Sequence, residues 1–180
     1  MGGFFSKIFN KNPSAEEDIA NEIITTSMRC GQAYVDNCPE NRRNEKNLSE
    51  HVNEFIYLFL HNINRAAYSK GGKSAQETIY NKVAKHVVTA LVSGLESEWR
   101  SKAIEHHMAG IIETENIYGQ CNKFVAEEGG SMANTLLWEA AKRVAQSEDI
   151  AEIMKAAELI SAGMHALRID DKVDLILKKR

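Results

Sequence analysis

Apolar side chains recur every three or four positions along most of the chain, which is the spacing of one helix face. The pattern predicts helices that begin at Ser14, at Asn47 and at Ser74. The third would run to Met108 and is apolar over most of its circumference, as is the second between Phe55 and Ile63. Because such helices are normally surrounded by others, we expect this antiparallel pair to form the core.

Short motifs predict where the helices start and stop. Ser14 and Ser74 are each followed three positions later by a glutamate, Glu17 or Glu77, which is the pattern of a capping box. Gly71-Gly72 is expected to end the second helix, since glycine accepts the positive φ of a helix C-terminus. Further helices are expected to begin at Ser131, at Ser147 and at Val173.

Together these patterns predict an all-α protein. Only two of the 180 residues are proline, and both lie outside the strongest periodic runs, so long segments lack helix breakers. A chain of this length has the size of one domain. We therefore expect a single-domain bundle of six to seven helices over residues 13–180, preceded by a short amphipathic N-terminal segment, residues 1–12.

Charge and cysteine content narrow the classes of partner and cofactor. The net charge is −3, and acidic residues are interspersed among the basic ones, so nucleic-acid binding is not expected. The three cysteines lack C-x-x-C spacing, which argues against a disulfide framework and a zinc knuckle and fits a reducing compartment. No apolar run approaches the roughly 20 residues that span a bilayer. We expect a cytoplasmic protein without a cofactor, with membrane association as an alternative.

The N-terminal segment carries a cluster of large apolar side chains. Phe4, Phe5, Ile8 and Phe9 fall on one side of a short helix, with polar residues opposite. Such a segment can contact a partner or lie weakly in the headgroup zone of a membrane, and the plainer alternative is a tail folded back onto the bundle. The opening six residues also fit the M-G-x-x-x-[ST] pattern of N-myristoylation.

Histidine and glutamate side chains are the candidates for a metal or small-ligand site. They are Glu105, His106 and His107 near the end of the third helix, Glu113 downstream of it, and His61 and His86 in the two core helices. No histidine follows a glutamate by three positions, as in di-iron bundles, and adjacent histidines on a helix point about 100° apart. If the two core helices pair antiparallel, His61 and His86 could share a polar pocket; hydrogen-bonded histidines are the plainer alternative.

The sequence holds no assembled catalytic signature, since the nucleophile elbow, the P-loop and the dinucleotide fingerprint are all missing. We expect a non-enzymatic protein of adaptor, inhibitor, immunity or regulatory type that binds a protein partner or forms a homo-oligomer. One alternative is a helical bundle, with or without enzymatic activity, that binds a small ligand or metal through histidine and glutamate. Another is a peripheral membrane protein anchored through its N-terminal segment.

Overall fold

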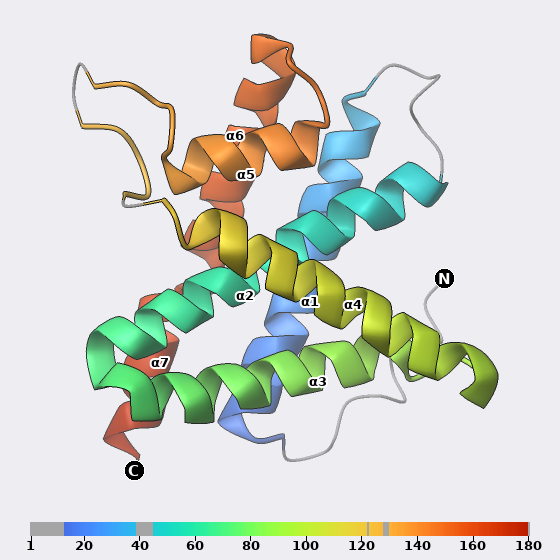
Figure 1. The fold of residues 1–180 in the computed structure, drawn as a ribbon, viewed down its shortest axis with the longest axis vertical. Coiled ribbons are helices and arrows are strands. Elements are labelled where there is room, and N and C mark those ends of the chain that lie inside the picture. Colours follow the sequence, from blue (N-terminus) through green and yellow to red (C-terminus); the bar gives the residue numbers. More distant parts are fainter. Residues whose placement is uncertain (1–12, 39–44, 122, 128–129, 180) are drawn as a thin grey trace.

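The computed structural model describes residues 13–38, 45–121, 123–127 and 130–179. In this part of the chain the regular elements are helices and no strand occurs, which confirms the all-α class. They are α1 (Ala15–Asp36), α2 (Glu45–Ala75), the π-helical turn η3 (Gln76–Tyr80), α3 (Asn81–Val92), α4 (Ser97–Tyr118), α5 (Leu136–Ala145), α6 (Ile150–Leu167) and α7 (Ile169–Lys178) (Figure 1). The predicted segment with Phe4, Phe5, Ile8 and Phe9 lies outside the described residues.

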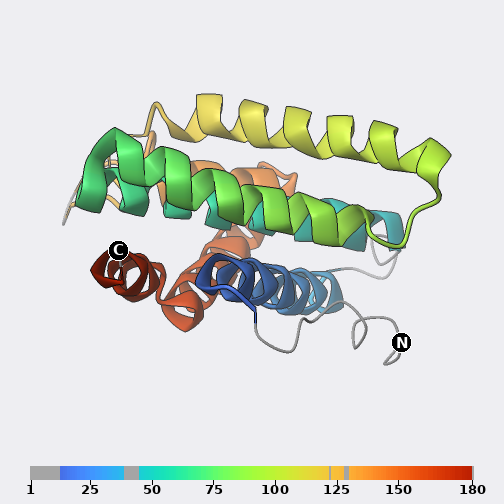
Figure 2. The same ribbon diagram turned by 90° about the horizontal axis from the view of Figure 1, so that it is seen from below.

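Helix α2 is the centre of the molecule. All nine residues from Phe55 to Ile63 are buried, including the polar His61 and Asn62. The helix packs against α1, α4, α5 and α7, and it lies between α4 on one side and α1 and α7 on the other (Figure 2). The prediction that this segment is an interior helix is confirmed, and its apolar character on every side is the reason that other helices enclose it.

The single helix predicted from Ser74 to Met108 is wrong. Helix α3 ends at Val92, and α4 begins at Ser97 and runs back antiparallel to α3 (Figure 2). The Ser93 hydroxyl donates to the Ala90 carbonyl at 2.9 Å, and the Leu95 amide donates to the Val92 carbonyl at 3.1 Å. These bonds span three residues and tighten the end of the helix, and Gly94 between them adds no side chain to the turn.

The junction between α2 and α3 also differs from the prediction. Gly72 breaks helical geometry with a φ of 66°, as expected of a glycine at a helix end, but no capping box forms at Ser74. Instead the Thr78 hydroxyl donates to the Ser74 carbonyl at 2.6 Å, and the chain continues through η3. Helices α2 and α3 diverge from this turn (Figure 1), so the predicted antiparallel core pair is wrong, and α3 packs on α1 and α4.

Side-chain caps mark the true starts of three helices. The Ser14–Glu17 capping box is confirmed, with both bonds at 3.2 Å. The Thr135 hydroxyl accepts from the amide of Trp138, and the Asp149 carboxylate accepts from Ala151 at 2.7 Å. The last three helices begin at Leu136, Ile150 and Ile169 rather than at the predicted Ser131, Ser147 and Val173. Thr135 and Asp149 cap the first two of these, whereas Arg168 before α7 has a left-handed backbone and makes no side-chain cap bond.

A glycine lets α6 approach the core closely. A Cβ atom on Gly163 would lie 2.6 Å from the Phe59 ring and 3.1 Å from the Cys30 sulfur. Both distances are shorter than ordinary van der Waals contact, and Phe59 itself is enclosed in the core. The α6 backbone therefore rests directly on side chains of α1 and α2.

We predict that Gly163→Ala lowers the free energy of unfolding by about 1–3 kcal/mol, because the added methyl group overpacks the space beside Phe59. Equilibrium urea unfolding measures this change. Ser161→Ala, on the exposed side of the same helix, is the matched control and should stay within about 0.5 kcal/mol of the wild type. Equal stability of all three proteins would contradict this account of the contact.

Candidate functional site

Helix α4 is attached to the bundle largely by polar bonds. Its buried residues are Ile111, Thr114 and Tyr118, a small apolar contribution for a helix of 22 residues. Facing it, α2 presents polar residues at steps of three and four. The α2–α4 polar network consists of Glu54, Tyr57, His61 and Asn64 of α2, His107, Glu113 and Glu115 of α4, Gln76 and Tyr80 of η3, and Arg143 of α5.

Glu115 is the acceptor at one end of this network. Its Oε2 atom receives hydrogen bonds of 2.8 Å from both His61 Nδ1 and Asn64 Nδ2, and the Tyr80 hydroxyl also bonds it. Burial raises the pKa of Glu115, but the hydrogen bonds from His61, Asn64 and Tyr80 lower it by more. The pKa of Glu115 therefore lies below its usual range. An ionised carboxylate can only accept, so His61 must carry a proton on Nδ1. Gln76 extends the chain of bonds by donating to Asn64 Oδ1 at 2.6 Å.

His61 is enclosed rather than open to a substrate. Only 2% of the residue is exposed, and its ring meets the edge of the Tyr118 ring with centroids 5.5 Å apart. Its second nitrogen, Nε2, has no hydrogen-bond partner among the described residues. A general base must reach the proton that it abstracts, and an enclosed nitrogen does not. The His61–Glu115 pair therefore joins α2 to α4.

Tyr57 and His107 form a second link between the same helices. The Tyr57 hydroxyl lies 3.0 Å from His107 Nδ1. Burial, with the nearby charges of Glu54 and Glu113, raises the pKa of Tyr57 to about 12. Burial and the neighbouring His106 lower the pKa of His107, so His107 is neutral and its Nδ1 atom accepts a hydrogen bond from the Tyr57 hydroxyl. Helix α4 comes this close because Gly110 faces the tyrosine; a Cβ atom there would lie 2.5 Å from its ring.

Arg143 links α5 to both helices. Its guanidinium donates two bonds to the Glu54 carboxylate, at 2.9 and 3.0 Å, and a third of 2.9 Å to Glu113. Burial lowers the pKa of Arg143, and the bonds to the two carboxylates more than reverse this and raise it. This bidentate hydrogen bond to Glu54 fixes the orientation of the guanidinium group as well as its distance from the carboxylate. Glu54 thereby positions α5 on α2, and Glu113 ties α4 to the same cation.

The structure does not bring the residues predicted for a metal or ligand site together. His61 and His107 belong to separate bonds of the network, and Glu113 pairs with Arg143. Glu105 and His106 are exposed, and His86 is half-buried on α3. His61 is bonded to Glu115 and is not brought together with His86. Among the described residues no group of three or more histidine, cysteine, aspartate or glutamate side chains has an arrangement that could hold a metal ion.

Sequence reasoning missed most of the network, including its central acceptor, Glu115. A signal was present in α2, where Glu54, Tyr57, His61 and Asn64 follow one another at steps of three, four and three within an apolar run. Polar residues on one side of a buried helix need partners there. The pattern therefore indicates a polar contact with another helix, although it does not identify that helix.

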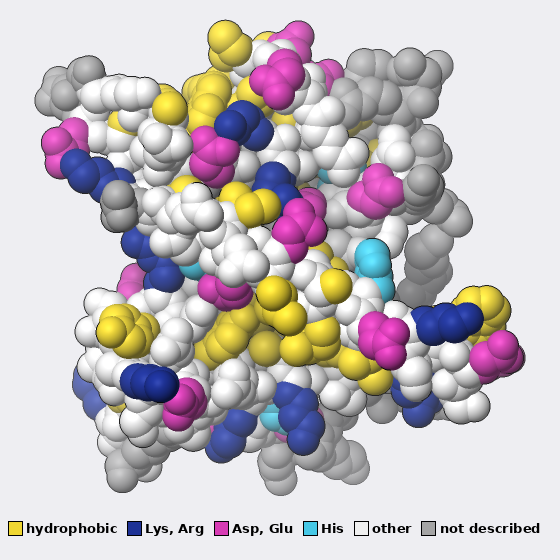
Figure 3. All heavy atoms as spheres, viewed as in Figure 1, with side chains coloured by type: hydrophobic (Ala, Val, Ile, Leu, Met, Phe, Trp, Pro, Cys, Tyr) yellow, Lys and Arg dark blue, Asp and Glu magenta, His cyan; other side chains and the backbone are white. Residues whose placement is uncertain are grey.

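In contrast to its polar contacts with α2, helix α4 exposes a line of apolar side chains to solvent. Ile104, Met108 and Ile112, which we call the α4 stripe, expose 38%, 44% and 57% of their surface at intervals of four residues. Leu95, in the turn before α4, and Trp99, in its first turn, are also exposed. Apolar atoms gather on this face of the molecule, over α3 and α4 (Figure 3). Four-residue spacing keeps such side chains in line along a helix, so they form a continuous strip.

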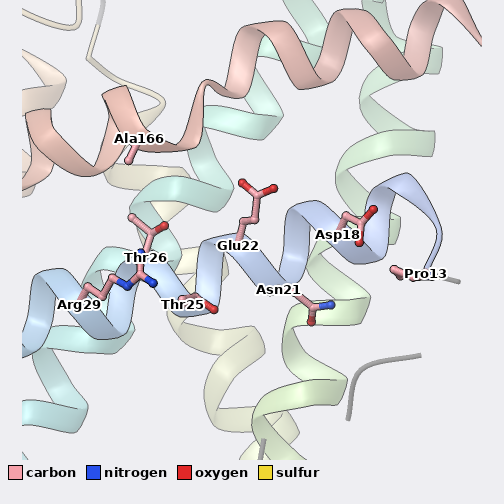
Figure 4. Close-up of a pocket in the computed structure, with 8 residues that line it drawn as sticks. All are labelled: Pro13, Asp18, Asn21, Glu22, Thr25, Thr26, Arg29 and Ala166. Atoms are coloured by element: carbon pink, nitrogen blue, oxygen red, sulfur yellow. The ribbon is translucent and has the colours of Figure 1, made fainter. Parts of the chain in front are cut away.

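A shallow hollow lies beside α1. Its volume is about 580 Å³, and its lining is Pro13, Asp18, Asn21, Glu22, Thr25, Thr26, Arg29 and Ala166 (Figure 4). The side chains are mostly polar, and Glu22 is engaged in an ion pair with Lys172 of α7. Small-molecule sites are typically apolar with a few convergent polar groups, which this hollow does not resemble.

Comparison with known proteins adds no relative: the chain matches no protein-family model, no curated protein and no solved structure. None of the helices in the described ranges has the length and apolar character needed to cross a bilayer.

We predict that Glu115→Gln lowers the free energy of unfolding by about 2–3 kcal/mol. The substitution removes the charge that strengthens the bonds from His61 and Asn64, and it brings an NH2 group among donors. Urea unfolding measures the loss. Glu105→Gln, the same chemical change at an exposed position of α4, is the control and should change stability by less than about 0.5 kcal/mol. Equal effects of the two substitutions would refute the role of Glu115.

We also predict that acidification weakens the fold through His107. Its pKa lies below the ordinary value of 6.5, so the unfolded chain binds the proton more readily than the folded one. The stabilisation is complete above pH 6.5 and is lost as pH falls through the folded pKa. Glu115, also lowered, adds a loss that starts only below its ordinary value of 4.5.

The measurement is the free energy of unfolding between pH 8 and pH 5 for the wild type and for His107→Gln. The wild type should lose stability faster than the variant as the pH falls below 6.5. His165→Gln, on the exposed side of α6, serves as the control and should leave the slope unchanged. Parallel profiles for the wild type and His107→Gln would show that His107 does not couple folding to pH.

Proposed function

We propose that this chain is a non-enzymatic interaction protein that binds a protein partner through the α4 stripe. The observation that carries the proposal is the unbroken line of exposed apolar side chains at Ile104, Met108 and Ile112. Contiguous apolar surface on a soluble domain marks an interaction site more often than single exposed residues do. A helix that offers side chains at intervals of four is the usual form of a helix-in-groove or helix-pair contact.

The attachment of α4 supports the same proposal. The helix is fixed through directional bonds from Tyr57, His61 and Arg143, and its outer side chains are not needed for that attachment. When a helix is already held in place, its exposed apolar side chains can bind a partner while the protein loses little conformational entropy. An adaptor, inhibitor, immunity or regulatory protein built on one domain of six to seven helices fits this arrangement.

A reducing, cytoplasmic location is part of the proposal. The Cys30 thiol donates to the Leu159 carbonyl at 3.6 Å, and the Cys121 thiol donates to the Ile117 carbonyl at 3.9 Å. Burial raises the pKa of Cys30 to about 11 and also raises that of Cys121. Both groups therefore remain protonated and unreactive at neutral pH, as thiols of a reducing compartment commonly do.

The test is Met108→Glu, which places a charge in the middle of the stripe without touching the polar network. We expect the variant to fold like the wild type and to lose at least tenfold in binding, because a central apolar contact typically contributes more than 1.4 kcal/mol. Binding is measured in two ways, as self-association of the purified chain and as capture of proteins from the native cell.

Leu175→Glu is the matched control, since Leu175 is 53% exposed but lies on α7, away from α4. It should leave both readouts as in the wild type. If Met108→Glu and Leu175→Glu bind as the wild type does in both assays, the α4 stripe is not an interaction surface and the proposed function fails.

A further inference from the structure

We propose that residues 97–106, the first half of α4, unfold and refold locally while the rest of the bundle stays folded. We call this segment the α4 arm. The opening itself goes beyond the proposed function, and only its consequence for binding rests on that function. The inference is carried by the burial pattern along α4 and by the position of the bonds that hold this helix on the bundle.

The arm contributes nothing to the core. In the range 93–109, which the structure describes in full, no residue is buried, and only Ala103 and His107 are half-buried. The three buried residues of α4 all lie beyond this range, between Ile111 and Tyr118. The arm and the turn before it project from the body of the molecule (Figure 1). Because most of the stability of a helix in a protein comes from packing, the arm lacks the main source of that stability.

The polar bonds that hold α4 begin only where the arm ends. The first is made by His107, whose ring nitrogen lies 3.0 Å from a hydroxyl of α2, and the others are made by Glu113 and Glu115. At the other end of the segment, Val92 of α3 is buried. Opening of the arm therefore leaves a loop of residues 93–106 whose two ends stay on the bundle.

The side-chain contacts seen within the arm are local. Arg100 donates to the Leu95 carbonyl at 2.9 Å, and the Lys102 Nζ atom lies 5.0 Å from the centroid of the Trp99 ring. Both contacts join the arm to itself or to the preceding turn. The N-cap residue, Glu96, makes no side-chain bond to the first amides of the helix. This end of α4 therefore lacks the stabilisation that a serine or aspartate cap provides.

An unpacked helical segment opens at little cost in free energy. Isolated helices shorter than about 12–15 residues are marginal in water, because each added hydrogen bond barely offsets the ordering of one more residue. The bonded second half of α4 supplies the nucleus from which the arm refolds. Opening should therefore start at the N-terminal end, and protection from hydrogen exchange should rise along the arm towards His107.

This opening divides the α4 stripe into two parts. Met108 and Ile112 lie in the half that the polar bonds hold, whereas Ile104 belongs to the arm. If the stripe binds a partner, as proposed above, Met108 and Ile112 are presented at all times and Ile104 only while the arm is folded. The arm thus sets how much of the apolar surface a partner meets.

Amide hydrogen exchange of the full-length chain, followed residue by residue by NMR, tests the opening. After correction for intrinsic rates, the amides of residues 101–106 should exchange about 100-fold faster, or more, than those of residues 114–118. Low concentrations of urea should leave the faster exchange unchanged, because local opening exposes little surface. The same concentrations should accelerate exchange of residues 114–118.

Substitutions in and before the arm test whether its own helical stability controls the exchange. Ser101 is exposed, so Ser101→Ala and Ser101→Gly change helix propensity without changing packing. Exchange of residues 102–106 should be about fivefold faster in the glycine variant than in the alanine variant. Glu96→Asp supplies a preferred cap and should slow exchange of the same amides about fivefold. Residues 114–118 are the internal control and should exchange at the same rate in all these variants.

Equal exchange rates for residues 101–106 and 114–118, with the same dependence on urea, would overturn the inference, since the arm would then open only with the bundle. Equal effects of the Ser101 substitutions on both sets of amides would overturn it as well. The proposed function is judged separately, because Met108 lies outside the arm. Loss of binding in Met108→Glu without local opening would retain that function and reject the arm, and local opening without loss of binding would do the reverse.

Discussion

The structure depends on one constraint, which is that the stretch of α2 from Phe55 to Ile63 has no side that tolerates water. A helix of this kind gains its stability only when other helices cover it completely, because each exposed large apolar side chain costs about 1.5–3 kcal/mol. Helices α1 and α7 cover one side, and α4 and α5 cover the other. The remaining elements connect these covers or fill the space between them.

The polar residues of α2 decide how α4 is placed on that core. An apolar contact tolerates sliding, whereas bonds at Tyr57, His61 and Arg143 define one register and one orientation. These bonds hold the inner side of α4, whereas Ile104, Met108 and Ile112 remain exposed. We propose that the inner side positions the helix and that these exposed side chains bind a partner.

The sequence predicted the all-α class and the interior position of α2, because the apolar residues from Phe55 to Leu60 cover every side of the helix and must be enclosed by other helices. It did not predict the reversal at Gly94, since the apolar periodicity continues across the turn. It also missed Glu115, because a glutamate in a helix normally faces solvent. The burial of Glu115 is decided by His61, which lies 54 positions away in the chain. Hydrophobic patterning carries no information about such pairings.

The bonded network also constrains how the sequence can diverge. His61 with Glu115, Tyr57 with His107, and Glu54 with Arg143 are pairs in which a change at one member leaves a buried polar group without its complement. Homologues that retain the fold should therefore change these positions together, as correlated substitutions, while Glu105 and His106 drift independently. An alignment of homologues would then show correlated substitutions at the bonded positions of α4 and independent substitutions at its exposed charged positions.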